Sequence, residues 1–332
     1  MILGGGGFKY EVVEGWGKLP EGLQLGGDIP GVATDSKDRV YVFNRSKHPV
    51  VVYESNGRFL GTWGENVFLG RPHGITITPD DIVWCTDDLD HTIRKFTLDG
   101  RLLQTLGTPN KPSDTGYFRN ATDSLESIKR GAGPFNRPTK VAEAPGGELY
   151  ITDGYGNARV HRFDAKGELI QSWGAPGEGP GQFNLPHSVW VHTDGRVFVC
   201  DRENSRVQIF SPTGDPLDVW NLAGRPQALA IDKDNHVFVS ARFWMAGART
   251  MAGKVMTESV PSHICICDLE GNLLAKWGTT NYGEMDSFVS AHGECIDSQG
   301  NWYIVENGQN GLKSLGIDRP NYPSLRKLAR VR

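Results

Sequence analysis

Apolar and polar residues alternate over short stretches along most of the chain, and glycine-containing turns separate these stretches. A representative stretch runs from Glu168 to Trp173 and follows a turn at Lys166-Gly167. Alternation with a period of two over a few residues predicts a β-strand that packs one face on a core. The pattern therefore predicts an all-β fold of many short antiparallel strands.

The predicted strands recur as a repeat, and each repeat closes with an aromatic or apolar residue followed by a small one. Six closing dipeptides occur, at Trp16-Gly17, Trp63-Gly64, Leu106-Gly107, Trp173-Gly174, Trp220-Asn221 and Trp277-Gly278. Successive dipeptides are 47, 43, 67, 47 and 57 residues apart. Because each interval holds about four short strands, the sequence predicts a six-bladed β-propeller.

The two longest intervals place loop insertions near residues 108–134 and 242–262 of one propeller domain that spans residues 1–332. Long loops on a rigid scaffold often carry function. A strand from Tyr10 to Trp16 has no blade before it, whereas the last unit, which starts near Ser287, lacks a closing strand. We therefore expect the N-terminal strand to complete the C-terminal blade and close the ring.

Composition and charge exclude several classes of function. The net charge is −4, from 35 basic and 39 acidic residues, so no overall positive field would attract nucleic acid or an anionic membrane. No stretch approaches the ~20 apolar residues of a membrane span. The five irregularly spaced cysteines suggest no disulfide framework, and the first nine residues lack the features of a secretory signal. The sequence predicts a cytoplasmic protein and leaves its oligomeric state open.

Three histidines share one repeat position. The innermost strand of each unit opens with a lead residue and a key residue, namely Pro30-Gly31, Pro72-His73, Pro138-Thr139, Pro186-His187, Pro226-Gln227 and Ala291-His292. Histidine is the key residue in units two, four and six, and in no other unit. Alternate blades of a six-bladed ring lie about 120° apart, so the three imidazoles are expected to meet at the channel axis.

Three histidines around one open position form the ligand set of a catalytic zinc ion. Iron(II), manganese and cobalt are compatible with the same nitrogen ligands. The plainer alternative is that His73, His187 and His292 bind channel water separately. Their strict alternation among only nine histidines favours a metal site.

Four motifs carry a resemblance to known proteins: Arg71-Pro72-His73-Gly74, Asp153-Gly154-Tyr155-Gly156-Asn157-Ala158-Arg159, Pro186-His187-Ser188 and Asp201-Arg202-Glu203-Asn204. The chain resembles the NHL-repeat family, and within it the peptidyl-α-hydroxyglycine α-amidating lyases, over about residues 31–307. The resemblance implies zinc at the three histidines and a catalytic tyrosine at Tyr155. It also implies that Arg45 and Arg202 hold a substrate carboxylate and support catalysis.

The chain departs from this family beside the third histidine. The family has Met-Pro-His-Asp there, whereas this sequence reads Ser290-Ala291-His292-Gly293. The aspartate that helps to bind a structural calcium ion is missing, so the sequence puts calcium in doubt. Gly156 replaces a cysteine, and the family's disulfides have no counterparts. These differences suit a cytosolic relative and argue against transferring the family's peptide substrate.

These residues predict a metal-dependent lyase that cleaves a C–N bond in a small carboxylate-bearing α-hydroxyamide or carbinolamine. Tyr155 would act as the general base, and Arg202 and Arg45 would clamp the carboxylate. Two alternatives stay open: a hydrolase or hydratase that uses metal-bound hydroxide, and a non-catalytic NHL-repeat scaffold. The insertion near 242–262 is expected to overhang the channel mouth and to influence the choice of substrate.

Overall fold

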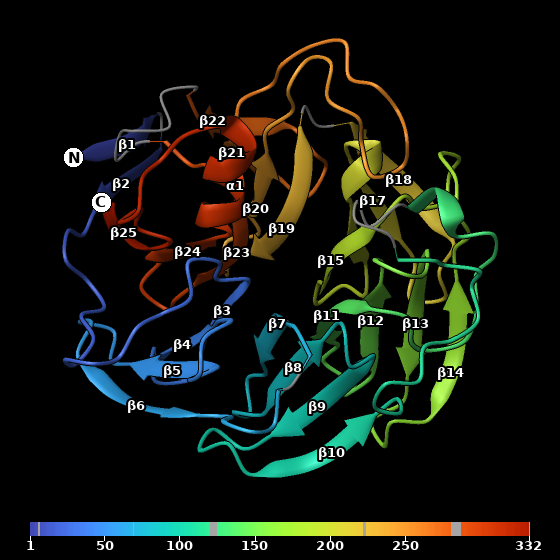
Figure 1. Cartoon of the computed structure of the whole chain (residues 1–332), viewed down its shortest axis with the longest axis horizontal. Coiled ribbons are helices and arrows are strands. Elements are labelled where there is room, and N and C mark those ends of the chain that lie inside the picture. The colour runs from blue at the N-terminus through green and yellow to red at the C-terminus, as the bar shows by residue number, and fades with distance from the viewer. Residues whose placement is uncertain (6, 69, 120–124, 222–223, 280–286, 332) are drawn as a thin grey trace.

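Six antiparallel sheets stand around a central channel in the computed structural model, which describes residues 1–332 except 6, 69, 120–124, 222–223, 280–286 and 332 (Figure 1). This arrangement confirms the predicted six-bladed propeller. Blade one consists of β3 (Gly31–Thr34), β4 (Val40–Phe43), β5 (Val50–Tyr53) and β6 (Phe59–Trp63). Blade two consists of β7 (Pro72–Ile77), β8 (Val83–Asp87), β9 (Thr92–Phe96) and β10 (Leu102–Leu106). In each blade the first strand is innermost.

The next three blades repeat this order. Blade three consists of β11 (Pro138–Glu143), β12 (Leu149–Asp153), β13 (Arg159–Phe163) and β14 (Leu169–Trp173). Blade four consists of β15 (Pro186–Val191), β16 (Val197–Asp201), β17 (Arg206–Phe210) and β18 (Pro216–Asn221). Blade five consists of β19 (Arg225–Ile231), β20 (Val237–Arg242), β21 (His263–Cys267) and β22 (Leu273–Trp277).

Blade six joins the two ends of the chain. It contains β23 (Ala291–Ile296), β24 (Trp302–Glu306), β25 (Leu325–Val331), β2 (Phe8–Val12) and β1 (Ile2–Gly5). The expected ring closure is confirmed, because β2 pairs antiparallel with β25. The strand ends earlier than predicted, however, and β1 adds a fifth strand. Gly15 adopts a φ of 67° that turns the chain away, and Trp16 then packs 5.3 Å from the ring of Tyr53 in blade one.

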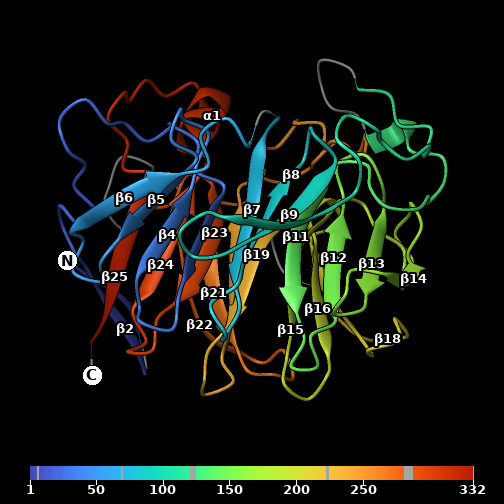
Figure 2. The ribbon, with the colours of Figure 1, turned by 90° about the horizontal axis from the view of Figure 1, so that it is seen from below.

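A short helix, α1 (Gly308–Leu315), lies between β24 and β25 and was not predicted. The helix occurs in only one of the six repeats, so no periodic pattern in the sequence predicts it. Gly316 ends the helix in a left-handed conformation, with a φ of 69°. Figure 2 shows α1 on the same face of the disc as the 3-10 helix η1 (Leu125–Ser127), which belongs to the insertion near 108–134.

The closing residue of a blade packs on the turn glycine of the next blade. A Cβ atom added at Gly100 would lie 2.7 Å from the ring of Trp63, and one at Gly214 would lie 2.6 Å from Trp173. Gly271 and Trp220 form the same contact. The closing residue and the turn glycine, which both recur in the sequence, therefore form the two sides of one interface between blades. This interface fixes the spacing of the blades around the channel.

Candidate metal centre

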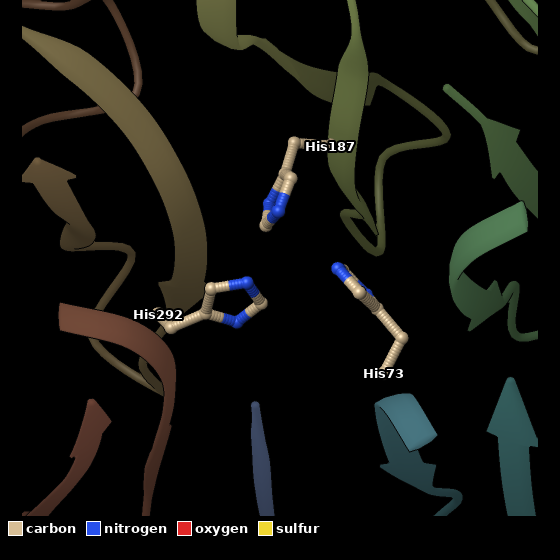
Figure 3. Close-up of side chains that lie close together, drawn as sticks. All are labelled: His73, His187 and His292. Atoms are coloured by element: carbon tan, nitrogen blue, oxygen red, sulfur yellow. The ribbon is translucent and has the colours of Figure 1, made fainter. Parts of the chain in front are cut away.

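His73, His187 and His292 converge inside the channel (Figure 3). Each is the second residue of its innermost strand, β7, β15 or β23, and at each the pairing with the next strand is shifted by a bulge or irregularity. Such a shift re-aims a side chain that regular pairing would fix. The three ring centres are 4.7 to 4.9 Å apart, and one nitrogen from each ring lies within 4.8 Å of the others.

The odd-numbered blades hold the three rings in one orientation. Nδ1 of His73 lies 2.8 Å from the Thr139 carbonyl oxygen, and Nδ1 of His187 lies 2.6 Å from that of Gln227. Nδ1 of His292 lies 2.9 Å from the carbonyl oxygen of Pro30. A carbonyl only accepts, so each Nδ1 carries the proton and each Nε2 presents a lone pair. This is the tautomer that a metal ion bound at Nε2 requires.

The three rings are held neutral. Burial lowers the pKa of each histidine well below its ordinary value, and neighbouring charges lower it further. Neutral imidazole is the form that binds metal. Nε2 of His292 is buried without a hydrogen-bond partner in the described part of the chain. A divalent cation would satisfy this lone pair, so the residues present fit a metal ion.

Tyr155 stands beside the three rings, in the turn between β12 and β13, and is 6% exposed. Its hydroxyl oxygen lies 3.4 Å from Nε2 of His73 and 3.3 Å from Nε2 of His187. Nη1 of Arg202 donates a 3.2 Å hydrogen bond to the same oxygen. Burial raises the pKa of Tyr155, but the charges of Arg202 and Arg71 outweigh burial and bring it below its ordinary value. The Tyr155 hydroxyl thus contacts two histidine nitrogens and an arginine, and its pKa lies below the ordinary value.

The two arginines implied by the family resemblance lie near the rings. Arg202 opens the 3-10 helix η2 (Arg202–Asn204), and its Nε donates to Glu203 over 2.8 Å. Nε of Arg45 donates to the carbonyl oxygen of Pro72 over 3.1 Å, directly before His73. No carboxylate of the described residues forms an ion pair with Arg45, and its charge acts on His292. Arg45 can therefore offer its guanidinium to an anion.

Sequence reasoning missed three further arginines and two acids. Arg71 and Arg137 both pair with Asp88, at 2.7 and 3.5 Å, and their guanidinium carbons each lie 4.9 Å from the centre of the Tyr155 ring. Arg225 pairs with Glu203, which also binds Arg202. A signal was present in the sequence. Each of these arginines directly precedes a lead proline, at Arg71-Pro72, Arg137-Pro138 and Arg225-Pro226.

The two insertions meet over Tyr155. Leu125 and Ile128 of the first insertion form a buried cluster with Tyr155, against which Met251 of the second packs. The Leu125 amide donates to the Met251 carbonyl oxygen over 2.9 Å. Sδ of Met251 lies 2.9 Å from Nη2 of Arg202. The segment near 242–262 therefore overhangs this mouth of the channel.

The structure bears on two differences from the amidating-lyase family, namely the missing aspartate after His292 and the missing disulfides. A Cβ atom at Gly293 would lie 2.7 Å from the carbonyl oxygen of Pro30 and 3.0 Å from Val305, so a carboxylate side chain does not fit there without movement. All five cysteines are free.

In the described part of the chain no helix is both long enough and apolar enough to cross a membrane.

Comparison with known proteins identifies the repeat. The NHL repeat model matches residues 135–163 and 183–210. NHL repeat-containing protein 3 of Mus musculus is 35% identical over 257 residues, which cover 71% of this chain and 70% of the mouse protein. The chain belongs to the NHL repeat family. It spans 60% of the length of the Homo sapiens protein of the same name.

Relatives of this NHL-repeat chain include enzymes. Peptidyl-alpha-hydroxyglycine alpha-amidating lyase 1 of Drosophila melanogaster is 34% identical over 171 residues, which cover 47% of this chain and 28% of the fly protein. Among solved structures, a streptogramin B lyase superposes with a TM-score of 0.61 over 98% of both chains. Because its sequence identity is 12%, that likeness shows the fold alone.

Proposed function

We propose that the chain is a metal-dependent lyase that cleaves the C–N bond of a small carboxylate-bearing α-hydroxyamide or related carbinolamine. The observation that carries this proposal is the convergence of three buried Nε2 atoms beside the Tyr155 hydroxyl and the Arg202 guanidinium. The relationship to the fly lyase supports the reaction class. The carboxylate-bearing substrate would be its small-molecule partner, and the near-balanced charge argues against nucleic acid.

His73, His187 and His292 would hold the metal, with zinc as the first expectation and iron(II), manganese or cobalt as alternatives. A bound divalent ion would polarise a substrate oxygen. Tyr155 then takes the hydroxyl proton as the C–O bond becomes a carbonyl. The electrons of the C–N bond leave with nitrogen, which accepts the proton that Tyr155 has taken up. The products are an amide or amine and a 2-oxo acid.

The arginines supply binding and orientation in this scheme. Arg202 donates to the Tyr155 oxygen and would stabilise the phenolate that acts as the base. Arg45, which has no acidic partner among the described side chains, would hold the substrate carboxylate together with Arg202. The insertions that meet at Met251 would shield the reaction from water. Because its five cysteines are free, we also infer a reducing, cytoplasmic site of action.

Metal analysis tests the centre itself. Protein purified without added metal should contain close to one divalent ion per chain, and fewer than ~0.1 ion with no tight binding on titration would overturn the metal site and leave the scaffold alternative. The reaction is tested by release of glyoxylate or another 2-oxo acid from N-acyl-α-hydroxyglycines. Turnover in ¹⁸O-labelled water separates the alternatives, because a hydrolase must place solvent oxygen in its product and a lyase need not.

A further inference from the structure

Arg242 begins the insertion that overhangs the channel mouth beside Tyr155, and the proposed reaction does not use it. It ends β20 of blade five and directly follows the residue that pairs with the lead proline Pro226. In blade four, Arg202 directly follows the residue that pairs with the lead proline Pro186. Arg242 therefore stands at the same repeat position as Arg202, one blade further around the ring.

A series of contacts links Arg242 to the candidate metal centre. Arg225 and Arg242 are paired opposite each other on β19 and β20. Nε of Arg225 donates to Oε1 of Glu203 over 3.1 Å, and the same oxygen accepts a 2.8 Å hydrogen bond from Arg202. Arg202 in turn donates to the Tyr155 hydroxyl oxygen. Arg242 thus lies one strand away from the charged groups that surround Tyr155.

Arg242 lacks the counter-charge that its neighbours have. The single carboxylate of Glu203 serves both Arg202 and Arg225. Among the side chains that the structure describes, no carboxylate forms an ion pair with Arg242. Its Nη2 donates to Oγ of Ser314 on α1 over 3.2 Å, and its Nε is buried without a hydrogen-bond partner in the described part of the chain. Since like charges that face each other across two strands destabilise a sheet, an anion bound at Arg242 would stabilise this blade.

Arg242 nevertheless carries its charge at neutral pH. Burial is the main cause that lowers its pKa to about 9, and the charges of Arg225 and Arg202 lower it as well. Because this value lies above 7, the guanidinium stays protonated in surroundings that disfavour its charge. An anionic ligand is the partner that such a group lacks.

Arg45 is a second arginine without an acidic partner among the described residues, and it lies on the other side of blade six. It follows β4 of blade one, whereas Arg242 ends β20 of blade five, and blade six stands between these two blades (Figure 1). The helix α1 of blade six contacts both sides. Near its start the Gln309 amide donates to the carbonyl oxygen of Gly27, which leads into blade one, and near its end Ser314 accepts from Arg242.

The proposed substrate accounts for only one of these two cations. Its single carboxylate is assigned to Arg45 together with Arg202, so a monoanion would leave Arg242 without a partner. The other arginines of this mouth pair with acidic residues, namely Arg71, Arg137, Arg202 and Arg225. Arg242 is therefore the cation that a second anionic group of the substrate would satisfy.

We infer that the substrate is a dianion whose second carboxylate, on the acyl group that leaves with nitrogen, pairs with Arg242. This inference rests on the proposed lyase function, which assigns the first carboxylate to Arg45 and Arg202. The reaction then yields a 2-oxo acid and the monoamide of a dicarboxylic acid. The guanidinium of Arg242 selects the substrate and takes no part in breaking the C–N bond.

Analogues that cannot be cleaved test this binding mode without turnover. N-succinyl-, N-glutaryl- and N-adipoylglycine carry both carboxylates and lack the reactive hydroxyl group. Each is titrated into the full-length protein by calorimetry and compared with its ω-carboxamide, which keeps only the glycine carboxylate. At least one diacid should bind about tenfold or more tightly than its carboxamide, because a charge-assisted hydrogen bond replaces a neutral one. In Arg242→Met the two affinities should agree to within about twofold.

Lys313→Met is the matched control, because Lys313 is an exposed cation of α1 directly before Ser314. It should keep the preference for the diacid. Loss of the preference in this variant would assign it to overall positive charge and overturn the role of Arg242. If Arg242→Met does not fold, Arg242→Gln takes its place, and the pairs of analogues still test the second carboxylate on the wild-type protein.

Two further results would overturn the inference: equal affinity of every diacid and its carboxamide for the wild-type protein, and an undiminished preference in Arg242→Met. Turnover of N-acetyl-α-hydroxyglycine by the wild-type protein reports on the lyase function separately. Turnover without a diacid preference would reject the second carboxylate alone. A diacid preference that depends on Arg242, without turnover, would reject the lyase reaction and retain the anion site.

Discussion

The hydroxyl oxygen of Tyr155 lies 3.3 Å from Nε2 of His187, and this contact joins a turn of blade three to the innermost strand of blade four. The same nitrogen is the one that faces the other two rings, because Nδ1 of His187 is bonded to the Gln227 carbonyl. A metal ion held by these nitrogens would therefore lie beside the phenol. Substitution of His187 tests metal binding, whereas substitution of Tyr155 tests the base, so the two roles can be measured separately.

Replacing His187 with alanine should remove the metal and leave the propeller folded. The ring contributes one of three ligands, so the affinity for zinc should fall by at least about 100-fold. Metal content after gel filtration and the far-ultraviolet circular dichroism spectrum measure the two effects. His48→Ala, a change at a partly exposed histidine bonded to Glu65, should keep the full metal content. Equal metal content in both variants would contradict the assignment.

Replacing Tyr155 with phenylalanine should slow turnover without removing metal. Loss of a general base costs about 10²- to 10⁴-fold in kcat, and the ring itself would be retained. The measurements are steady-state kinetics and metal analysis on the same sample. Tyr150→Phe removes the hydroxyl of another buried tyrosine, which donates to the carbonyl of Pro212, and should retain activity. Full activity in Tyr155→Phe would exclude its role as the base.

Replacing Arg45 with lysine should weaken the binding of substrate more than it slows the chemical step. Arginine can offer two parallel N–H groups to a carboxylate, and lysine offers a single charge. We expect KM to rise by about tenfold with a smaller change in kcat. Arg58→Lys, in an exposed ion pair with Glu54, provides the control. A fall in kcat at unchanged KM would place Arg45 in the chemical step instead.

Glu203 should make stability depend on acid pH. Burial raises the pKa of Glu203, but Arg225 and Arg202 outweigh it and hold the pKa at about 2. Because this value lies below that of the unfolded chain, the ionised group stabilises the fold above about pH 4.5, and the contribution disappears as the pH falls toward 2. Its full size is about 3 kcal/mol.

Urea unfolding of the wild-type protein and of Glu203→Gln at pH 7 and pH 3 measures this contribution. The difference in the free energy of unfolding between the two proteins should be large at pH 7 and much smaller at pH 3. The exposed Glu54→Gln provides the comparison and should show little difference at either pH. A difference that does not change with pH would mean that the charge of Glu203 does not stabilise the fold.

Replacing Gly100 with alanine should destabilise the contact between blades one and two. Gly100 has a φ of 86°, and an added Cβ atom would lie 2.7 Å from the ring of Trp63. Backbone strain and the clash together should lower the free energy of unfolding by about 1–3 kcal/mol. Gly146→Ala meets no atom within 4 Å and should have little effect. Equal stability of the two variants would show that the contact is unimportant.

The sequence predicted features that recur and missed those that occur once. Trp63 and Gly100 belong to a periodic pattern, and the same period placed His73 in register with the two other histidines. The strand β1 and the helix α1 have no copies elsewhere in the chain, so no comparison between units could predict them. The contact between Leu125 and Met251 joins two insertions that follow no period. Only the folded chain brings them together.

The closure of blade six has a consequence for biosynthesis. Tyr10 on β2 and Arg330 on β25 are paired and hydrogen-bonded at a separation of 320 residues (Figure 1). On the ribosome, blades one to five can form in turn as their strands emerge, since each is built from consecutive residues. The hairpin of β1 and β2 must wait until β25 has been synthesised. Contacts of such long range are slow to form, so the rate-limiting event in folding should come after β25 has emerged.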